Sequence, residues 1–414
     1  MKLPLLPLLL FSLCVAEAGA QEWTRFHGPD GGGISKAEGF PSSFGEKDWS
    51  WKIELPGPGI SSPVLWGTKL FLTSEGGEKG QRFVLAYDAT TGRELWRVPD
   101  TFTAHGKHQF NSFASSTPCV DADRLYLSWA SGGSMKVMAL THEGKPAWNK
   151  DLGSYHEDHG SGASPILAGG VLVIVKDNVG GDSFIAGLKP SDGSIVWRHE
   201  RLSTRTPFAT PLVFRQKDGA EAVLLPGNPK ALTCLNAADG KLLWEVENAT
   251  PGDRPVASPV IADGVCYATV GQGGIGKSCV AVRVTDARPD ILWQIRKGIP
   301  YVPTAVGSGK LLYLLGDGGI LSCVKAADGE VLYTERVFAD KAYSSPVLVG
   351  DKLYCVGRSG QVAVVQAGET FKKLGEATLG EDTDSTPAIA GGRIFFRTRT
   401  RLMSLPASRD APRP

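Results

Sequence analysis

The chain has 414 residues, 42% of them hydrophobic, and its 44 Lys and Arg almost balance its 43 Asp and Glu, so the formal net charge is +1. This balance gives no electrostatic reason to expect nucleic acid as a partner. The length is sufficient for one large domain with a sizeable core.

The N-terminal segment predicts a secretory signal peptide over residues 1–20. Lys2 precedes an apolar run over residues 3–15, and Ala18-Gly19-Ala20 matches a small-residue cleavage site. The run is short for a membrane span, and no other segment reaches that length. We therefore expect a periplasmic or secreted protein without a transmembrane segment. Lipidation at Cys14 is an alternative, although Leu13 stands where such signals have a small residue.

Residues 21–48 lack the alternation of strands, and we expect an irregular N-terminal arm. Residues 49–55 alternate like the closing strand of a repeat unit, although they precede the first complete copy. The last copy, in turn, stops after Leu405 without its final strand. We expect residues 49–55 to supply that strand and close the ring, which removes exposed sheet edges. Residues 407–414 are expected to be a disordered tail.

Eight copies of one repeat occupy the remaining chain. Each opens with Ser or Thr followed by Pro, or once by Ala, and an apolar residue eight positions later falls in a second strand, as from Pro346 to Tyr354. The openings, 41 to 55 residues apart, are Pro63, Pro118, Pro165, Pro211 (with a small insertion), Pro259, Ala305, Pro346 and Pro387. Four short strands per period of this length predict an all-β, eight-bladed propeller of four-stranded blades over residues 49–406.

In five copies an aromatic residue follows a turn glycine by four positions, as from Gly193 to Trp197, and Trp293 holds the same place in a copy whose turn has no glycine. A large aromatic side chain buries much area, so we expect these residues to pack between neighbouring blades rather than to stack on ligands. The tryptophans assigned this structural role are Trp51, Trp96, Trp148, Trp197, Trp244 and Trp293.

The stretch Ala237-x-Asp239-Gly240-x-x-Leu243-Trp244 resembles the tryptophan-docking repeat of the pyrroloquinoline-quinone-like (PQQ-like) propellers. That superfamily includes quinoprotein alcohol dehydrogenases and the outer-membrane lipoprotein that assists β-barrel assembly. The opening Trp23-x-x-Phe26-His27-Gly28-Pro29 is similar to a secreted, uncharacterised branch of it. The resemblance covers about residues 23–405. It implies a fold more than an activity, because the repeat residues are structural.

The resemblance raises the question of a bound quinone. In the dehydrogenases the cofactor rests on an aromatic floor beside vicinal cysteines and a calcium ion held by carboxylates and an amide. No two cysteines are adjacent in this sequence, and it has no C-x-x-C-H haem motif. We therefore predict no resident cofactor. A quinone (PQQ) or a divalent metal, in an oxidoreductase that uses the loop face, is the alternative.

Residues 271–278, Gly271-Gln272-Gly273-Gly274-Ile275-Gly276-Lys277-Ser278, match the phosphate-binding P-loop expression. A P-loop needs a helix behind it, whose N-terminal amides hold the phosphates. The following residues 279–284 alternate and are β-branched, which predicts a strand. We interpret the motif as a hairpin turn and expect no nucleotide.

Cys266 and Cys279 lie on the two arms of that hairpin, symmetric about Gln272-Gly273. The symmetry allows them to face each other, and export would permit a disulfide. The alternative is that both are buried as small apolar residues.

Candidate ligand-binding residues gather in two loops, and four of the seven histidines fall there. Both loops connect an outer strand to the next inner strand, so they lie on one face of the ring. The residues are His105, His108 and Asn111 before the second copy, His156, Glu157, Asp158 and His159 before the third, and Asp177 and Asn178 in the middle hairpin of the third. Converging His, Asp and Glu side chains suit a divalent metal or a small ligand. Hydrogen bonds between blades, or solvation, are the alternatives.

Four arginines near the loops of later copies add positive charge to the same face: Arg201, Arg205, Arg254 and Arg296. A ring of loops on a rigid propeller suits recognition. We expect a monomeric binding or scaffold module for a protein or an extracellular polymer.

Overall fold

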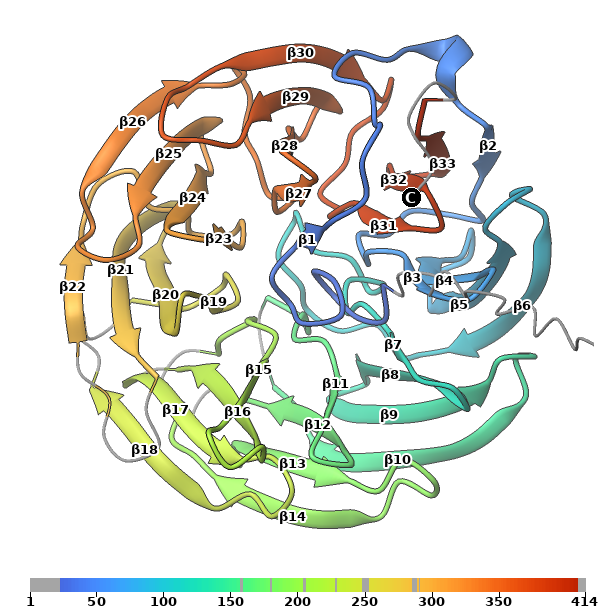
Figure 1. Cartoon of the computed structure of the whole chain (residues 1–414). Coiled ribbons are helices and arrows are strands. Elements are labelled where there is room, and N and C mark those ends of the chain that lie inside the picture. Colours follow the sequence, from blue (N-terminus) through green and yellow to red (C-terminus); the bar gives the residue numbers. More distant parts are fainter. Residues whose placement is uncertain are drawn as a thin grey trace, which may run out of the picture.

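The computed structural model describes residues 23–156, 159–178, 181–203, 206–227, 229–247, 253–284, 289 and 291–408. Eight sheets are arranged around a central axis, with the chain running once around the ring (Figure 1). The eight-bladed, all-β propeller is therefore confirmed. The predicted signal peptide, Cys14 and residues 409–414 lie outside the described residues. Within the described part of the chain, no helix is long and apolar enough to cross a bilayer.

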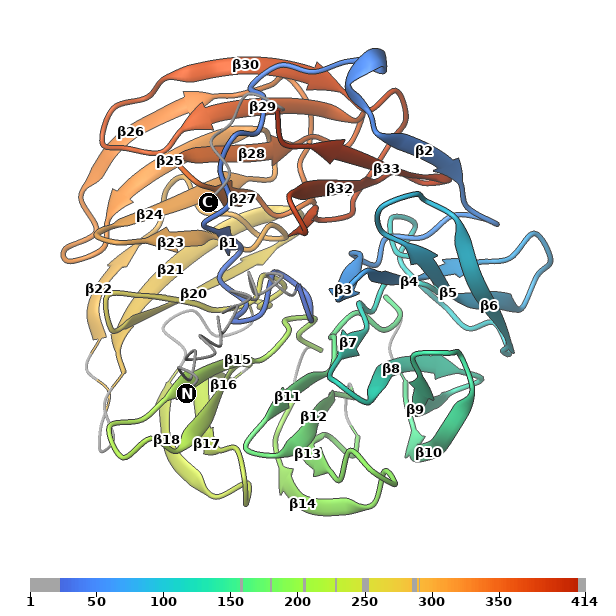
Figure 2. The same ribbon diagram turned by 45° about the vertical axis from the view of Figure 1, so that its right-hand side comes forward.

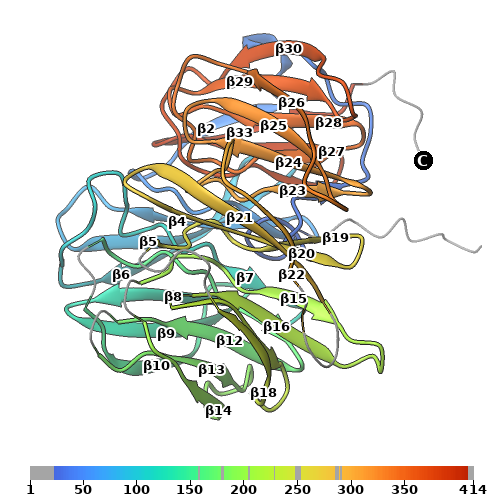
Figure 3. The same ribbon diagram turned by 90° about the vertical axis from the view of Figure 1, so that its left-hand side faces the viewer.

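The first four blades each have four antiparallel strands in sequence order, numbered from the axis outward (Figure 2 and Figure 3). Blades 1 and 2 consist of β3 (Val64–Trp66), β4 (Lys69–Glu75), β5 (Gln81–Asp88), β6 (Glu94–Thr101), β7 (Cys119–Val120), β8 (Arg124–Ser131), β9 (Ser134–Thr141) and β10 (Pro146–Ser154). Blades 3 and 4 consist of β11 (Ile166–Ala168), β12 (Val171–Lys176), β13 (Phe184–Leu188), β14 (Ile195–Glu200), β15 (Leu212–Arg215), β16 (Glu221–Pro226), β17 (Lys230–Asn236) and β18 (Leu242–Glu247).

The last four blades follow the same order, except that blade 8 takes one strand from the N-terminal part of the chain. Blades 5 and 6 consist of β19 (Val260–Ala262), β20 (Val265–Gln272), β21 (Ile275–Arg283), β22 (Ile291–Ile295), β23 (Val306–Ser308), β24 (Leu311–Gly316), β25 (Ile320–Lys325) and β26 (Val331–Arg336). Blades 7 and 8 consist of β27 (Val347–Val349), β28 (Lys352–Val356), β29 (Gln361–Gln366), β30 (Lys373–Thr378), β31 (Ala388–Ala390), β32 (Arg393–Arg397), β33 (Arg401–Pro406) and β2 (Trp51–Glu54).

The repeat spacing sets the register of the two innermost strands. In blade 7 the residue after the Pro, Val347, lies opposite Tyr354, eight positions past Pro346. The same pairing joins Val64 to Phe71 and Ala388 to Phe395. These residues are fully buried. The spacing therefore marks a buried cross-strand pair that faces the neighbouring blade.

Ring closure follows the prediction. Strand β2 pairs antiparallel with β33, Trp51 lying opposite Ser404 and Glu54 opposite Arg401. The Arg401 guanidinium lies 2.8 Å from the Glu54 carboxylate across this pair. The eighth blade is thus completed by a strand from the start of the propeller, and β33 has no exposed edge.

The arm is more ordered than expected. It contains β1 (Ile34–Ser35), which pairs parallel with the inner strand β27, and a short 3-10 helix, Glu46–Asp48. Residues 23–35 cross the centre of the ring (Figure 1), where the backbones of Trp23, Thr24 and Gly33 accept hydrogen bonds from blades 1, 2 and 7. This crossing closes one end of the central channel.

Five of the six repeat tryptophans lie against the turn of the next blade. Trp148 Nε1 donates to the carbonyl oxygen of Pro190 at 2.8 Å, and a Cβ on Gly193 would lie 2.6 Å from the Trp148 ring. The turn glycine thus gives the indole room as well as a positive φ of 72°. The same contact joins Trp51 to Gly92, Trp96 to Gly144, Trp197 to Gly240 and Trp293 to Gly329. The corresponding turn for Trp244, residues 285–288, lies outside the described residues.

The Ser or Thr before each Pro has a role that the repeat did not reveal. Its side-chain oxygen accepts a hydrogen bond from the backbone N–H of its counterpart in the preceding blade, as from Ser62 to Thr117 at 2.9 Å. We call these eight residues the Ser/Thr belt: Ser62, Thr117, Ser164, Thr210, Ser258, Thr304, Ser345 and Thr386. Seven such bonds of 2.9 to 3.2 Å join consecutive members. The belt ties the blades together around the axis.

The series of hydrogen bonds in the belt is interrupted between blade 8 and blade 1. Among the described residues, the buried Ser62 hydroxyl has no hydrogen-bond partner. Arg397 instead donates to the carbonyl oxygen and the hydroxyl of Ser61, at 2.9 and 2.7 Å. Burial lowers the pKa of Arg397 to about 9. A buried guanidinium from blade 8 therefore holds the seam with blade 1.

The P-loop-like motif forms the hairpin between β20 and β21, with Gly273 and Gly274 at positive φ in its turn. The predicted strand is confirmed. The disulfide alternative is wrong, because Cys266 lies opposite Val282 and Cys279 opposite Thr269. The two cysteines pack into different core clusters on opposite faces of the blade, and both are free thiols.

Candidate functional site

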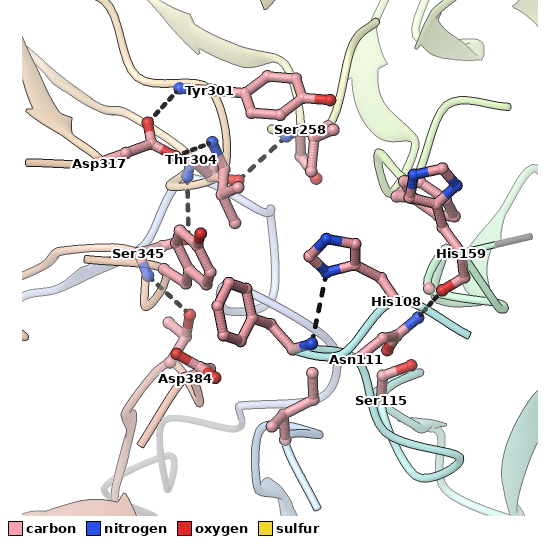
Figure 4. Close-up of a pocket in the computed structure, with 18 of the residues that line it drawn as sticks. His108, Asn111, Ser115, His159, Ser258, Tyr301, Thr304, Asp317, Ser345 and Asp384 are labelled. Carbon is pink, nitrogen blue, oxygen red and sulfur yellow. Dashed lines mark hydrogen bonds between the residues drawn. The ribbon is translucent and has the colours of Figure 1, made fainter. Parts of the chain in front are cut away.

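A funnel opens at the channel end opposite the arm, where the connecting loops enter the blades. Figure 4 shows residues that line it. Its volume is about 700 Å³, and loops of all eight blades contribute to its wall. Phe26 of the arm and Ile60 lie at its apolar part, and the Ser/Thr belt runs around it. A cavity of this size and mixed lining is typical of a ligand site.

Three of the predicted residues line the funnel: His108, Asn111 and His159. The His108 and His159 rings are stacked, with centroids 5.6 Å apart and planes within 6°. Asn111 Nδ2 donates to the carbonyl oxygen of His159 at 2.7 Å (Figure 4). The loops of blades 2 and 3 are thus joined by direct contacts at the funnel wall.

The stacked pair has a defined electrostatic setting. Burial lowers the pKa of His108, and the positive charges of His159, Arg254 and Arg358 lower it further. The neutral imidazole is therefore favoured at neutral pH. Of the four arginines that the sequence placed on this face, Arg254 lies at this part of the funnel.

The other predicted residues lie away from the funnel wall. His105 packs edge-on against Phe113, with ring centroids 5.0 Å apart. The backbone N–H of His156 donates to Asn178 Oδ1 at 3.0 Å, and Asn178 is buried. These contacts tie the third-blade hairpin to its loop. Glu157 and Asp158 lie outside the described residues.

Asp177 is a buried structural residue. Its carboxylate lies 3.3 Å from Arg201 Nε, and both side chains are almost inaccessible. Burial raises the pKa of Asp177, while Arg201 lowers it. This pair joins the hairpin of blade 3 to the loop that enters blade 4, so Arg201 does not contribute charge to the funnel. Arg205 lies outside the described residues, and Arg296 contacts Gln294 on the ring's periphery.

Several funnel residues were not singled out by the sequence. Phe110 extends from the second-blade loop across the ring to blade 7, where Arg358 Cζ lies 4.1 Å from its ring centroid. The Tyr343 ring lies 5.8 Å from the Phe110 ring, edge-on. The Ser or Thr before Pro was visible in every repeat, whereas nothing in the sequence distinguished Phe110 from the other aromatic residues.

Two carboxylates of the funnel are already engaged. Asp384 forms ion pairs with Arg358 at 2.6 Å and with Arg399 at 3.1 Å. Asp317 accepts hydrogen bonds from the backbone N–H groups of Tyr301 and Val302, at 2.6 and 3.2 Å (Figure 4). Burial raises the pKa of Asp317 to about 6.

The donor set does not match the quinone site that the resemblance implied. All six cysteines of the described residues are buried, and none lies among the described funnel residues. Across the described ranges, no three His, Cys, Asp or Glu side chains are grouped to share a metal ion. The aromatic residues are present, but the vicinal cysteines and the carboxylate cluster are not reproduced there.

Comparison with known proteins places the fold in a family. A family model described as outer membrane protein assembly factor BamB matches residues 79–299 and 281–408, which is most of the chain. The chain belongs to this BamB family of PQQ-like propellers. BamB of Yersinia pestis is 22% identical over 374 residues, 86% of this chain and 86% of that protein.

Solved structures share the BamB-like fold at low identity. BamB from Moraxella catarrhalis superposes with a TM-score of 0.64 at 15% identity, over 88% of this chain and 99% of that chain. Quinohemoprotein alcohol dehydrogenase ADHIIG from Pseudomonas putida HK5 gives 0.65 at 12% identity, over 95% of this chain and 82% of that chain. These likenesses show the architecture shared by the two kinds of propeller.

Proposed function

We propose that the protein is an exported binding module that holds a protein partner on its funnel face. The observation that carries this proposal is the funnel itself, about 700 Å³ in volume and lined by loops of every blade. Loops on a rigid scaffold are the usual place for recognition in such folds. The Ser/Thr belt and the docked tryptophans supply the rigidity.

Two further observations support a protein as the partner and export as the setting. The Yersinia pestis relative is named for outer membrane protein assembly, and it matches this chain along most of both lengths. Residues 1–20 have the pattern of a secretory signal. We infer that the partner is itself an exported protein, met in the periplasm or outside the cell.

Site-specific photo-crosslinking tests the proposal. A photoreactive residue at Gln109, exposed at the funnel rim, should capture a protein that mass spectrometry identifies. The matched control is Glu143, exposed in the turn before β10 and so on the opposite face. Equal capture at both positions, or none at Gln109, would contradict the proposal. A crosslinked species removed by glycosidases but not by proteases would identify an extracellular polymer instead.

A further inference from the structure

Arg254 is a buried cation at the funnel wall. It belongs to the loop that enters blade 5 and is only 9% exposed, and it lines the funnel. Two backbone hydrogen bonds to Gly271, of 2.8 and 3.0 Å, fix its position. The guanidinium carbon lies 5.5 Å from the Phe208 ring centroid. Its Nε is buried and, among the described residues, has no hydrogen-bond partner.

Three other buried arginines bond to groups of the fold, although Arg82 Nη2 and the Nε and Nη2 atoms of Arg397 have no hydrogen-bond partner among the described residues. Arg82 pairs with Asp100 at 2.7 Å, and Arg25 donates to the carbonyl oxygen of Pro211 at 2.9 Å. Arg397 bonds to Ser61. For Arg254, the described residues provide neither a carboxylate nor a hydrogen-bond acceptor. Burying an uncompensated charge is costly, so the site favours an anion that supplies the missing partner.

The charged residues around Arg254 also favour an anionic ligand. His108 and Lys341 line the same funnel, and Arg254 is close enough to His108 to repel its charged form. The two acidic residues there are engaged elsewhere, Asp384 by two arginines and Asp317 by two backbone N–H groups. The positive charge at Arg254 is thus available to a ligand.

The shape of the funnel limits how a polypeptide can enter. The arm closes the far end of the channel, with Phe26 at the funnel floor. A closed floor accepts a chain end but not a segment that passes through. Phe208 and Tyr301 beside the arginine offer aromatic surface for an apolar side chain next to the charged group.

We propose that the funnel receives the C-terminal carboxylate of the partner protein, with Arg254 as its charge partner. This inference rests on the proposed function and specifies the part of the partner that is recognised. A guanidinium binds a carboxylate through two parallel N–H donors, which orients the chain end as well as holding it. The last side chain then lies against Phe208 and Tyr301.

The test uses two fluorescent pentapeptides, one ending in Phe and one in Leu, each with a free C-terminal carboxylate and as the amide. Fluorescence anisotropy with the mature protein should show the acids binding about 10- to 100-fold more tightly than the amides. Arg254→Gln should remove that difference. Arg283→Gln, an exposed arginine of the same blade, should leave it unchanged. Circular dichroism of both variants checks that they are folded.

The pKa of His108 supplies a second measurement, which does not require the Arg254→Gln variant. Because burial and nearby cations lower the pKa of His108, a bound carboxylate should raise it, which NMR titration measures. Equal affinity of acids and amides, no binding at millimolar peptide, or a folded Arg254→Gln protein that keeps the preference would each overturn the inference. Phenylacetate that binds at Arg254 while the peptides do not would assign the site to a free organic acid and overturn the chain-end assignment.

The experiments distinguish failure of the chain-end inference from failure of the proposed function. If the crosslink at Gln109 still captures the same protein in Arg254→Gln, while the peptides show no carboxylate preference, the binding face stands and the chain-end inference falls. If neither the crosslink nor the peptides show binding, both fall.

Discussion

At the arm end of the central channel, the buried side chains of His27 and Arg25 contact backbone carbonyl groups. The two ring nitrogens of His27 contact the carbonyl oxygens of Gly31 and Pro346 at 2.9 and 3.0 Å, and Arg25 bonds to Pro211. At the funnel end, Arg254 is buried without such a partner, and two histidines are stacked at the wall. One set of contacts completes the fold, whereas the other leaves bonding capacity for a ligand. His27 and Arg254 thus differ in how fully the fold uses their bonding capacity.

The largest effect on folding is expected from deleting the N-terminal arm together with the closing strand β2. Deleting residues 21–55 removes β2 together with the arm, leaves β33 with an unpaired edge, and should give aggregated protein. Size-exclusion chromatography measures this directly. Deleting residues 21–48 alone keeps β2 and should leave a monomer of lower melting temperature. A stable monomer after the longer deletion would show that β2 does not close the ring.

The contribution of the arm to stability can also be tested at a single residue, His27. His27 is 1% exposed and has a positive φ of 62°. His27→Ala should lower the free energy of unfolding by about 1–3 kcal/mol, because a buried carbonyl group loses its N–H donor. Urea unfolding measures the change. His156→Ala is the matched control, since His156 is exposed and bonds to Asn178 through its backbone N–H, and it should change stability by less than about 0.5 kcal/mol. Equal effects would show that His27 is not a structural residue.

At the funnel end, Asp317 should make stability depend on pH. Its pKa is raised by burial from 3.8 to about 6, so the folded state binds the proton more tightly than the unfolded state. The resulting stability is fully present below pH 3.8 and is lost as pH rises through 6, a change of about 3 kcal/mol at most. Asp317→Asn should abolish this part of the pH dependence. Urea unfolding of both proteins at several pH values between 4 and 7.5 checks it, and an unchanged slope would contradict the assignment.

The smallest effect is expected at the P-loop-like turn, whose glycines 273 and 274 line the funnel. Lys277 is exposed on β21, so Lys277→Ala should change the free energy of unfolding by less than about 0.5 kcal/mol. Calorimetry with ATP supplies the second measurement. ATP binding that Lys277→Ala abolished would mean that a cation outside Arg254 recognises anions at this end.

The fold was predictable because its signals are local. Most blades repeat a Ser/Thr-Pro opening, a turn glycine and an aromatic residue within one period, so Pro346, Gly193 and Trp197 could be placed without information from distant parts of the chain. The unfinished last copy and the lone strand at Trp51 then indicated closure. The disulfide alternative failed because the turn lies one residue later than assumed and a bulge follows at Gly271. The resulting register places Cys266 and Cys279 on opposite faces of the sheet.

The site was predictable only in part, because it combines single residues from eight loops. Two residues of the predicted histidine cluster, His108 and His159, line the funnel. Burial and pairing decide the rest, and both depend on contacts between distant blades. Arg201 and Arg254 are alike in sequence context, yet one pairs with Asp177 and the other faces the funnel. The contact of Phe110 with blade 7 likewise cannot be predicted from the repeat pattern.

The closing strand has a consequence for how the molecule folds. Glu54 and Arg401 are 347 residues apart in sequence, whereas the strands within the other blades are joined by short turns. Bringing such distant segments together costs about 4 kcal/mol more chain entropy than closing a five-residue turn. The first seven blades can form hairpin by hairpin, and the contact between β2 and β33 must come last. Until then the chain carries two unpaired strand edges, so the folding intermediate, rather than the native ring, is the species that has to be protected from aggregation.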